Sequence, residues 1–345
     1  MYKPETRRII KSFLFIFIFL LTGKGYSQEE DLKSVRLMFY NVENLFDIYD
    51  DTLKDDNEFL PDGLKRWTLT RYNRKINMLF KTIISAGNWS PPCIVALSEV
   101  ENRKVLQDLV YGTYLSKYNY KIIHEESPDQ RGIDVCMIYR GDHVKVADYK
   151  YWIPQDGKSE GFLSRSILYV KFFIRTDTVH VFVNHWPSRR GGVLAGEENR
   201  KRIASMIRMK TDSLMNVSHA GAKIIMIGDF NSAPDDMEIK SLTIPSGSGY
   251  AMMNLSERLS DTGLGTYRYQ GTWEMIDQII VSGTLLTAEK GLFTDEEMIK
   301  VFRPEYLLEK DPKYPGLTPH STYRGYKYQG GYSDHLPVLL DLKFR

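Results

Sequence analysis

Short apolar segments recur along the chain and alternate with polar stretches. Seven of them have the length and the β-branched content that are typical of strands buried on one or both faces. They cover residues 34–40, 93–97, 135–139, 179–183, 223–227, 276–281 and 336–344. Two further segments, residues 71–86 and 197–215, carry apolar residues at helical spacing, and Gly87 follows the first of them.

Strand and helix candidates are interspersed from one end of the chain to the other. No internal repeat, low-complexity tract or Pro/Ser-rich linker divides them. This arrangement predicts a single α/β domain in which two sheets pack together with helices outside. The two longest polar stretches, residues 47–66 and 303–333, are expected to be binding loops.

The first 27 residues are typical of a secretory signal peptide. Basic residues precede an apolar run over residues 12–21, and the small residues Gly25 and Ser27 follow it. The run is too short to span a bilayer, so we expect no stable membrane insertion after cleavage. The expected mature domain covers residues 28–345 and is exported to the periplasm or out of the cell.

The charge balance changes once the signal peptide is removed. The 345-residue chain carries 46 basic and 44 acidic residues. Residues 1–27 hold five basic residues and one acidic residue, so the mature chain has 41 basic and 43 acidic residues and a formal charge of −2. Sequence-independent DNA binding depends on a basic excess, which is absent here. Recognition of nucleic acid must therefore come from the site itself.

The cysteine content leaves two interpretations open. Cys93 and Cys136 both lie in apolar, strand-like segments. In an exported protein they can form a disulfide, and they can equally be two buried thiols.

Polar side chains gather where the expected strands begin or end, which is where a scaffold presents a site. These residues are Asn41, Glu43, Glu99, Asn184, His185, Arg189, Asp229, Asn231, Asp277, Asp334 and His335. Most of them offer oxygen ligands, which hard cations such as Mg²⁺ or Mn²⁺ prefer. The histidines lack the spacing of a standard zinc site.

The remaining side chains supply acid–base and cationic chemistry. Asp277 lies within an apolar strand, where an unpaired carboxylate costs several kcal/mol, so it needs a partner. His335 beside Asp277 suits a general base held in one tautomer. His185 and Arg189 suit stabilisation of charge on a phosphoryl oxygen. Metal-assisted phosphoester hydrolysis is the reaction class that uses all of these groups.

The ordered set of motifs resembles the endonuclease/exonuclease/phosphatase superfamily, which includes deoxyribonuclease I, abasic-site endonucleases and bacterial sphingomyelinases. The resemblance runs from Asn41 to the last strand. It implies a four-layered α/β sandwich of two mostly antiparallel sheets flanked by helices, with the site at one edge.

The resemblance also implies roles for individual residues. Metal ligands are expected at Glu99 and Asp334, together with Asn41 or Glu43. The expected catalytic residues are His335, Asp277, Asp229, Asn231 and His185, and the expected phosphate contacts are Asn184, Arg131 and Arg189. Either His335, oriented by Asp277, or Asp229 is expected to activate the attacking water.

These features predict an exported, monomeric phosphodiesterase that depends on Mg²⁺ or Mn²⁺, with nucleic acid as the leading substrate. Two alternatives stay open: a phospholipid or sugar-phosphate phosphoesterase, and a non-catalytic binding protein on the same scaffold. The aromatic residues of 302–332 can stack on bases, bind lipid or pack a long loop. The Asp-rich residues 47–62 can form a solvated loop, a second cation site or a substrate gate.

Overall fold

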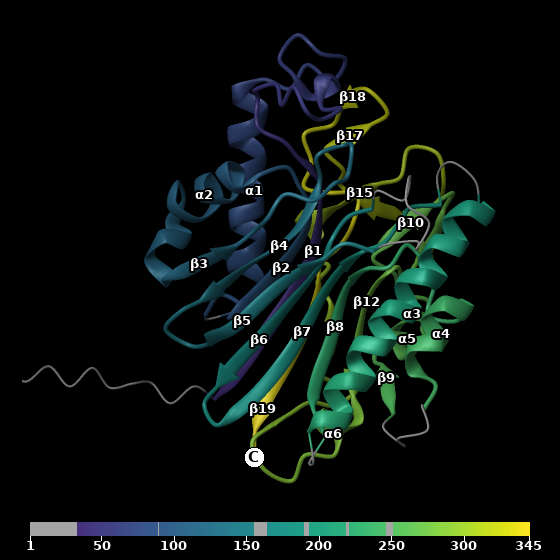
Figure 1. Cartoon of the computed structure of the whole chain (residues 1–345). Helices are drawn as coiled ribbons and strands as arrows, with labels where there is room; N and C mark the ends of the chain where they lie inside the picture. Colours follow the sequence, from purple (N-terminus) through teal and green to yellow (C-terminus); the bar gives the residue numbers. More distant parts are fainter. Residues whose placement is uncertain (1–32, 89, 155–163, 190–192, 219–220, 246–250) are drawn as a thin grey trace, which may run out of the picture. The chain divides into compact units, whose positions relative to one another are not determined.

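Two extended sheets lie at the centre of the described part of the chain (Figure 1). The first sheet has seven strands. In spatial order they are β13 (Leu292–Phe293), β19 (Val338–Phe344), β1 (Ser34–Leu45), β2 (Ile94–Val100), β4 (Asp134–Arg140) and β3 (Tyr120–Ile123), and β14 (Ile299–Val301) also pairs with β19.

The second sheet has six strands in the described residues. Their order is β5 (Lys145–Trp152), β6 (Ile167–Ile174), β7 (Asp177–His185), β8 (Lys223–Asp229), β12 (Asp277–Ser282) and β9 (Met252–Asn254). Among the described strands, β1 with β2 and β7 with β8 pair in parallel, and the other neighbours are antiparallel. Both sheets are therefore mostly antiparallel.

The central strands are apolar on both faces because each face is covered. In β1, Met38 and Tyr40 belong to the cluster that packs against the helices, whereas Phe39 points to the opposite face, toward the second sheet. In β8, Met226 faces helices and Ile227 faces the first sheet. A continuous apolar run is thus the pattern of a strand inside a layered sandwich.

Helices cover the outer face of each sheet, which makes four layers (Figure 1). The first sheet packs against α1 (Leu69–Ala86) and α2 (Arg103–Tyr111), and the second against α3 (Val193–Val217) and α4 (Met237–Thr243). The shorter helices are α5 (Ser256–Asp261), α6 (Gly283–Leu286), η1 (Asn57–Phe59), η2 (Tyr114–Tyr118) and η3 (Glu305–Leu307). The predicted helices at 71–86 and 197–215 coincide with α1 and α3.

Three small hairpins complete the described structure. They pair β10 (Tyr267–Tyr269) with β11 (Thr272–Glu274), β15 (Leu308–Lys310) with β16 (Leu317–Pro319), and β17 (Tyr323–Arg324) with β18 (Lys327–Tyr328). Two of them lie within residues 303–333, so this stretch is more ordered than the expected loop. Its tyrosines Tyr323 and Tyr328 pack against each other, with ring centroids 5.4 Å apart.

The two cysteines do not pair. Both are buried, and both are free thiols. In the ladder between β2 and β4, Cys136 lies opposite Leu97, four residues beyond Cys93 along the chain. The sheet register therefore keeps the thiols apart, because a disulfide needs Cα atoms within about 7 Å.

This computed structural model describes residues 33–345 except 89, 155–163, 190–192, 219–220 and 246–250. Lys33–Arg345 form one unit by their internal contacts. The expected signal peptide lies outside the described residues, so its cleavage stays a prediction. No helix in the described ranges has the length and apolar character needed to cross a membrane.

Candidate active site

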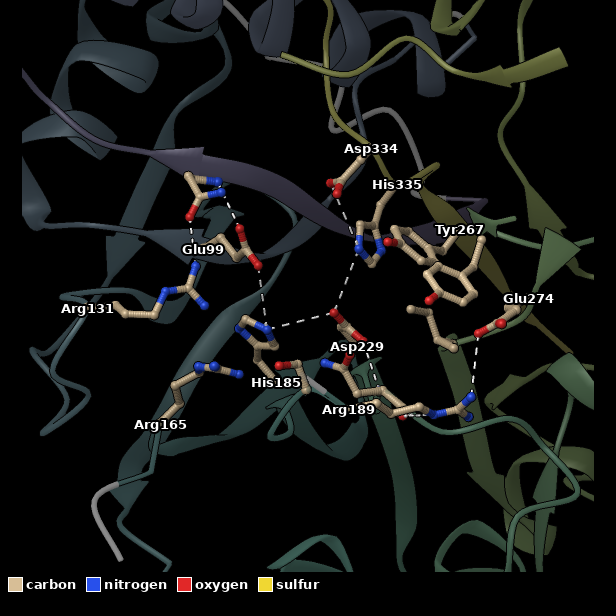
Figure 2. A pocket seen from close by; sticks show the side chains of 15 residues that line it. Glu99, Arg131, Arg165, His185, Arg189, Asp229, Tyr267, Glu274, Asp334 and His335 are labelled. Atoms are coloured by element: carbon tan, nitrogen blue, oxygen red, sulfur yellow. Dashed lines mark hydrogen bonds and ion pairs between the residues drawn. The ribbon is translucent and has the colours of Figure 1, made fainter. Parts of the chain in front are cut away.

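A pocket of about 470 Å³ opens where strands of the two sheets end (Figure 2). Eight of the twelve residues expected at the site line it: Glu99, Arg131, His185, Arg189, Asp229, Asn231, Asp334 and His335. The other four do not line it: Asn41, Glu43, Asn184 and Asp277.

Asp229 stands at the centre of the pocket because of the register of the second sheet. It ends β8 between His185 of β7 and Asp277 of β12, each directly opposite in its ladder. Its oxygens accept hydrogen bonds from Asn41 Nδ2 at 3.0 Å and from the Asn231 backbone N–H at 2.9 Å. Burial, together with the negative charge of Asp277, raises the pKa of Asp229 to about 7.

The glycine before Asp229 permits a close approach of two strands. A Cβ atom at Gly228 would lie 2.2 Å from the backbone carbonyl oxygen of Asn184 on β7. Only glycine therefore allows β7 and β8 to meet at this point. Because the two strands meet here, His185 and Asp229 lie side by side at the same edge of the second sheet.

His335 is held by Asp277. The Nδ1 atom of His335 lies 2.7 Å from Asp277 Oδ2, and both residues are buried. The other ring nitrogen, Nε2, lies 4.0 Å from oxygens of both Asp229 and Asp334. Burial lowers the pKa of His335, but the charge and hydrogen bond of Asp277 and the charges of Asp229 and Asp334 outweigh it, so the pKa is raised well above its ordinary value.

Glu99 faces the same pocket from the first sheet. Its backbone is left-handed, with φ of 62°, a strained conformation that is found at functional sites. The carboxylate accepts a hydrogen bond of 2.9 Å from the Asn44 backbone N–H. Burial raises its pKa, yet the positive charges of Arg131, His335 and Arg165 hold the pKa below the usual value. Glu99 is therefore an ionised carboxylate.

The donor set fits a divalent cation. Glu99 and the partly exposed Asp334 both line the pocket. Asp229, Asp277 and His335 bring three donor atoms within 4.8 Å of one another. Among the described residues, Asp277 Oδ1 and His185 Nδ1 are buried polar atoms without a hydrogen-bond partner. Carboxylate oxygens in this number suit a hard divalent ion.

Three arginines supply positive charge. Arg131 donates to Asn44 Oδ1 at 2.8 Å, and Arg189 donates to the Asn231 carbonyl at 3.1 Å and to Asp236 at 3.0 Å. Arg165 is buried and donates to the Trp186 carbonyl at 2.9 Å. Burial and the positive charges of Arg165 and Arg131 hold the pKa of His185 well below its ordinary value. His185 is therefore neutral.

The side chain of Asn184, an expected phosphate contact, lies inside the second sheet. It is fully buried, donates to the carbonyls of Phe182 and Ile227, and accepts from Trp186 Nε1 at 3.1 Å. These hydrogen bonds tie its amide group to the sheet, and its contact with phosphate stays a prediction. The reason for its placement is strand geometry: consecutive side chains point to opposite faces, so His185 faces the pocket and Asn184 does not.

The oxygens of Glu43 and Asn41, the two alternatives expected as a further metal ligand, accept hydrogen bonds within the protein, and their role as ligands stays a prediction. Both carboxylate oxygens of Glu43 accept backbone hydrogen bonds, from Thr322 at 2.5 Å and from Tyr323 at 2.8 Å. The amide oxygen of Asn41 accepts the Glu43 N–H at 3.0 Å, so its nitrogen faces Glu99 and Asp229. Glu43 anchors a loop, and Asn41 positions the two carboxylates.

Sequence reasoning missed part of the pocket wall. The missed residues are Asn44, Arg165, Ser188, Tyr267, Tyr269, Glu274 and Ile276. Arg165 could have been predicted from the sequence, because the polar triplet Ser164–Ser166 directly precedes the apolar run of β6. No pattern marks Tyr267 or Glu274, because each strand of their hairpin is only three residues long.

A family model described as the endonuclease/exonuclease/phosphatase family matches residues 36–344. The chain belongs to this family. No curated protein matches the sequence of this family member.

Solved structures share its fold at low identity. A mannosyl-6-phosphatase from Bacteroides thetaiotaomicron VPI-5482 superposes with a TM-score of 0.56 at 15% identity, covering 90% of this chain and 100% of that one. The human nocturnin catalytic domain with bound sulfate gives 0.55 at 16% identity, with coverages of 90% and 95%. D. rerio TDP2 complexed with a single-strand DNA product gives 0.55 at 12% identity, with coverages of 90% and 99%.

These neighbours confirm the predicted α/β sandwich. The family and the site together identify this member as a metal-dependent phosphoester hydrolase. A non-catalytic binding protein would require the loss of a carboxylate or of the histidine from the site. Glu99, Asp229, Asp334 and His335 all line the pocket, so that alternative has no support.

Proposed function

We propose that this chain is an exported phosphodiesterase that uses Mg²⁺ or Mn²⁺ and hydrolyses nucleic acid by in-line attack of water. One observation carries the proposal: the His335–Asp277 pair, Asp229 and Glu99 converge on one pocket with Arg131 and Arg165. Anionic and cationic groups in this arrangement suit a phosphoryl centre that gains charge during the reaction. The structure of TDP2 with a single-strand DNA product adds support from the same fold.

The residues divide the chemistry between them. A bound divalent cation supplies Lewis-acid charge, and Glu99 and Asp334 would hold it. Asp277 fixes the Nδ1 side of His335, which turns Nε2 toward the pocket. A water between Nε2 of His335 and Oδ2 of Asp229 can pass its proton to Asp229. His335 can take that proton only in its neutral form, because its raised pKa otherwise keeps both ring nitrogens protonated.

Cationic and neutral donors stabilise the phosphoryl oxygens. Arg131 and Arg165 line the pocket on the side of Glu99, and neutral His185 lies between the carboxylates, with Nε2 3.8 Å from Glu99 and 3.7 Å from Asp229. Charge-assisted hydrogen bonds from such donors strengthen as negative charge develops on the phosphorane.

A sugar-phosphate phosphomonoesterase is the second candidate. The pocket is bounded on one side by Tyr267, Tyr269 and Glu274, which suit a compact polar group rather than a long polyanion. The mannosyl-6-phosphatase with the same fold agrees with this candidate.

The deciding experiment measures hydrolysis by the mature protein, residues 28–345, with and without Mg²⁺ or Mn²⁺. The substrates are bis-p-nitrophenyl phosphate, p-nitrophenyl phosphate, plasmid DNA, RNA and sphingomyelin. Metal-dependent cleavage of DNA or RNA that is lost in His335→Ala supports the nuclease. Cleavage confined to monoesters or to sphingomyelin supports phosphoester hydrolysis but contradicts nucleic acid as the substrate. No hydrolysis by folded, metal-loaded protein rejects the proposal.

Export and monomeric state are further parts of the proposal. N-terminal sequencing of protein recovered outside the cytoplasm should begin at residue 28, and size-exclusion chromatography should give a single-chain mass. An intact N-terminus on protein confined to the cytoplasm contradicts export.

A further inference from the structure

The two sides of the pocket differ in chemistry. On one side Figure 2 shows Arg131 and Arg165 near Glu99, which suits phosphoryl oxygens. On the other side, beyond Asp229 and His335, lie Tyr267 and Glu274. This second side offers a carboxylate and phenol rings, with the Arg189 guanidinium beside the carboxylate, so a neutral hydroxylated group fits it better than a second phosphate.

Tyr267 and Glu274 are held at a fixed place by the β10–β11 hairpin. They lie directly opposite each other in its ladder, and the turn residues Gln270 and Gly271 both have positive φ, as a tight two-residue turn requires. The Thr266 N–H donates to the Glu274 carbonyl at 2.9 Å, and the Leu336 N–H donates to the Thr266 carbonyl at 2.7 Å.

The same hairpin is tied to His335. Tyr267 forms a backbone bridge with His335, and their ring centroids lie 4.9 Å apart. Arg268 braces the outer side by donating to the carbonyls of Gly271 at 3.0 Å and Pro315 at 2.6 Å. The hairpin backbone that carries Glu274 is therefore connected directly to His335.

Glu274 has acceptor capacity for a ligand. Its side chain is 27% exposed, and Arg189 Nη1 lies 3.6 Å away, farther than a hydrogen bond reaches. An ionised carboxylate accepts hydrogen bonds and donates none, and its two oxygens match two neighbouring hydroxyls. Phenol rings beside it offer flat apolar faces with a polar edge. A sugar ring complements these groups, because its hydroxyls can donate to the carboxylate and its C–H faces can pack on the phenol rings.

We propose that the β10–β11 hairpin binds the sugar ring next to the scissile phosphate, with Glu274 accepting hydrogen bonds from its vicinal 2,3-diol. The inference rests on the proposed phosphoester hydrolysis and narrows its substrate to phosphoesters of hydroxylated sugars, either ribonucleotides or hexose phosphates. A deoxysugar leaves a Glu274 oxygen without its donor, and this loss weakens binding.

The test compares substrates that differ by one hydroxyl. The nucleotide arm uses the p-nitrophenyl esters of uridine 5′-monophosphate and deoxyuridine 5′-monophosphate. The hexose arm uses glucose 6-phosphate and 2-deoxyglucose 6-phosphate, with phosphate release as the readout. Bis-p-nitrophenyl phosphate, which lacks a sugar, reports phosphoester hydrolysis by the purified wild-type protein with Mg²⁺ or Mn²⁺.

In the wild type, kcat/KM should favour the hydroxylated substrate about tenfold or more in at least one arm, which also identifies the sugar source. In Glu274→Gln that ratio should fall toward one, whereas Glu297→Gln, an exposed glutamate outside the pocket, should keep it. A ratio near one in both wild-type arms, or an unchanged ratio in Glu274→Gln, overturns the inference. If the folded, metal-loaded protein hydrolyses neither bis-p-nitrophenyl phosphate nor any substrate of the two arms, the proposed function is rejected and the inference with it.

Discussion

The ammonium group of Lys75 on α1 donates a hydrogen bond of 2.5 Å to the backbone carbonyl oxygen of Tyr332, three residues before His335. The same group donates to Thr322 Oγ1 at 2.5 Å, and Lys75 is almost completely buried. Glu43 holds the same loop through the backbone N–H groups of Thr322 and Tyr323. A buried lysine and glutamate thus fix the segment that delivers Asp334 and His335.

Replacing Lys75 by methionine should destabilise the protein by about 3 kcal/mol or more, because it leaves the Thr322 hydroxyl and the Tyr332 carbonyl without their buried donor and removes the positive charge that lowers the pKa of Glu43. Urea unfolding measures the change in unfolding free energy. Lys81→Met is the matched control, since Lys81 lies exposed on the same helix and should change stability by less than about 0.5 kcal/mol. Equal midpoints for the two variants would contradict this role of Lys75.

Asp277→Asn should lower kcat by roughly 10²–10⁴-fold while the fold is retained. An amide in place of the carboxylate no longer holds the Nδ1 proton of His335 in the required tautomer, and this defect has large effects wherever a carboxylate orients a histidine. Steady-state kinetics and circular dichroism give the two readouts. Asp261→Asn, at the exposed end of α5, should keep wild-type kcat.

Chelation of divalent cations should abolish hydrolysis, and added Mg²⁺ or Mn²⁺ should restore it. Glu99→Gln and Asp334→Asn should each raise the metal concentration for half-maximal activity at least about tenfold, because each removes a carboxylate from the pocket. Metal titrations of activity measure this. Full activity in excess chelator would show that the site works without a cation.

Stability should decrease in mild acid because of His180, which lies on β7 away from the pocket. Burial, together with the positive charge of Lys171, lowers its pKa to about 4, whereas a histidine in the unfolded chain titrates near about 6.5. Between these values the unfolded state binds more protons, so the unfolding free energy falls as the pH drops from about 6.5 to 4.

Denaturant unfolding across this range checks the His180 contribution. His180→Gln keeps a polar side chain beside Tyr169 but does not titrate, so the wild type should lose about 1–2 kcal/mol more than the variant between pH 6.5 and 4. Parallel stability curves for the two proteins would exclude this contribution of His180.

Local patterns predicted much of the scaffold. The apolar runs at 223–227 and 276–281 became β8 and β12, and the helical spacing of 71–86 became α1. The predicted set lacks β6 (Ile167–Ile174) and the edge strand β5, whose residues are largely exposed. An exposed edge strand carries little apolar pattern, because only burial on a face imposes one.

The sequence by itself determined which residue types stand at the strand ends, since a carboxylate or histidine after a buried strand can be seen without any neighbour. It did not determine what each side chain meets. Asn41 and Glu99 are 58 positions apart, and Glu43 and Thr322 are 279 apart.

Only the tertiary structure decided which side chains contact one another. Register set Asp229 between His185 and Asp277, and strand alternation turned Asn184 away from the pocket. The distant loop at Thr322 occupied both oxygens of Glu43, and a short hairpin brought Glu274 to the wall. The physical reason is that side-chain direction and hydrogen-bond partners depend on which strands and loops become neighbours, and long-range packing alone settles that.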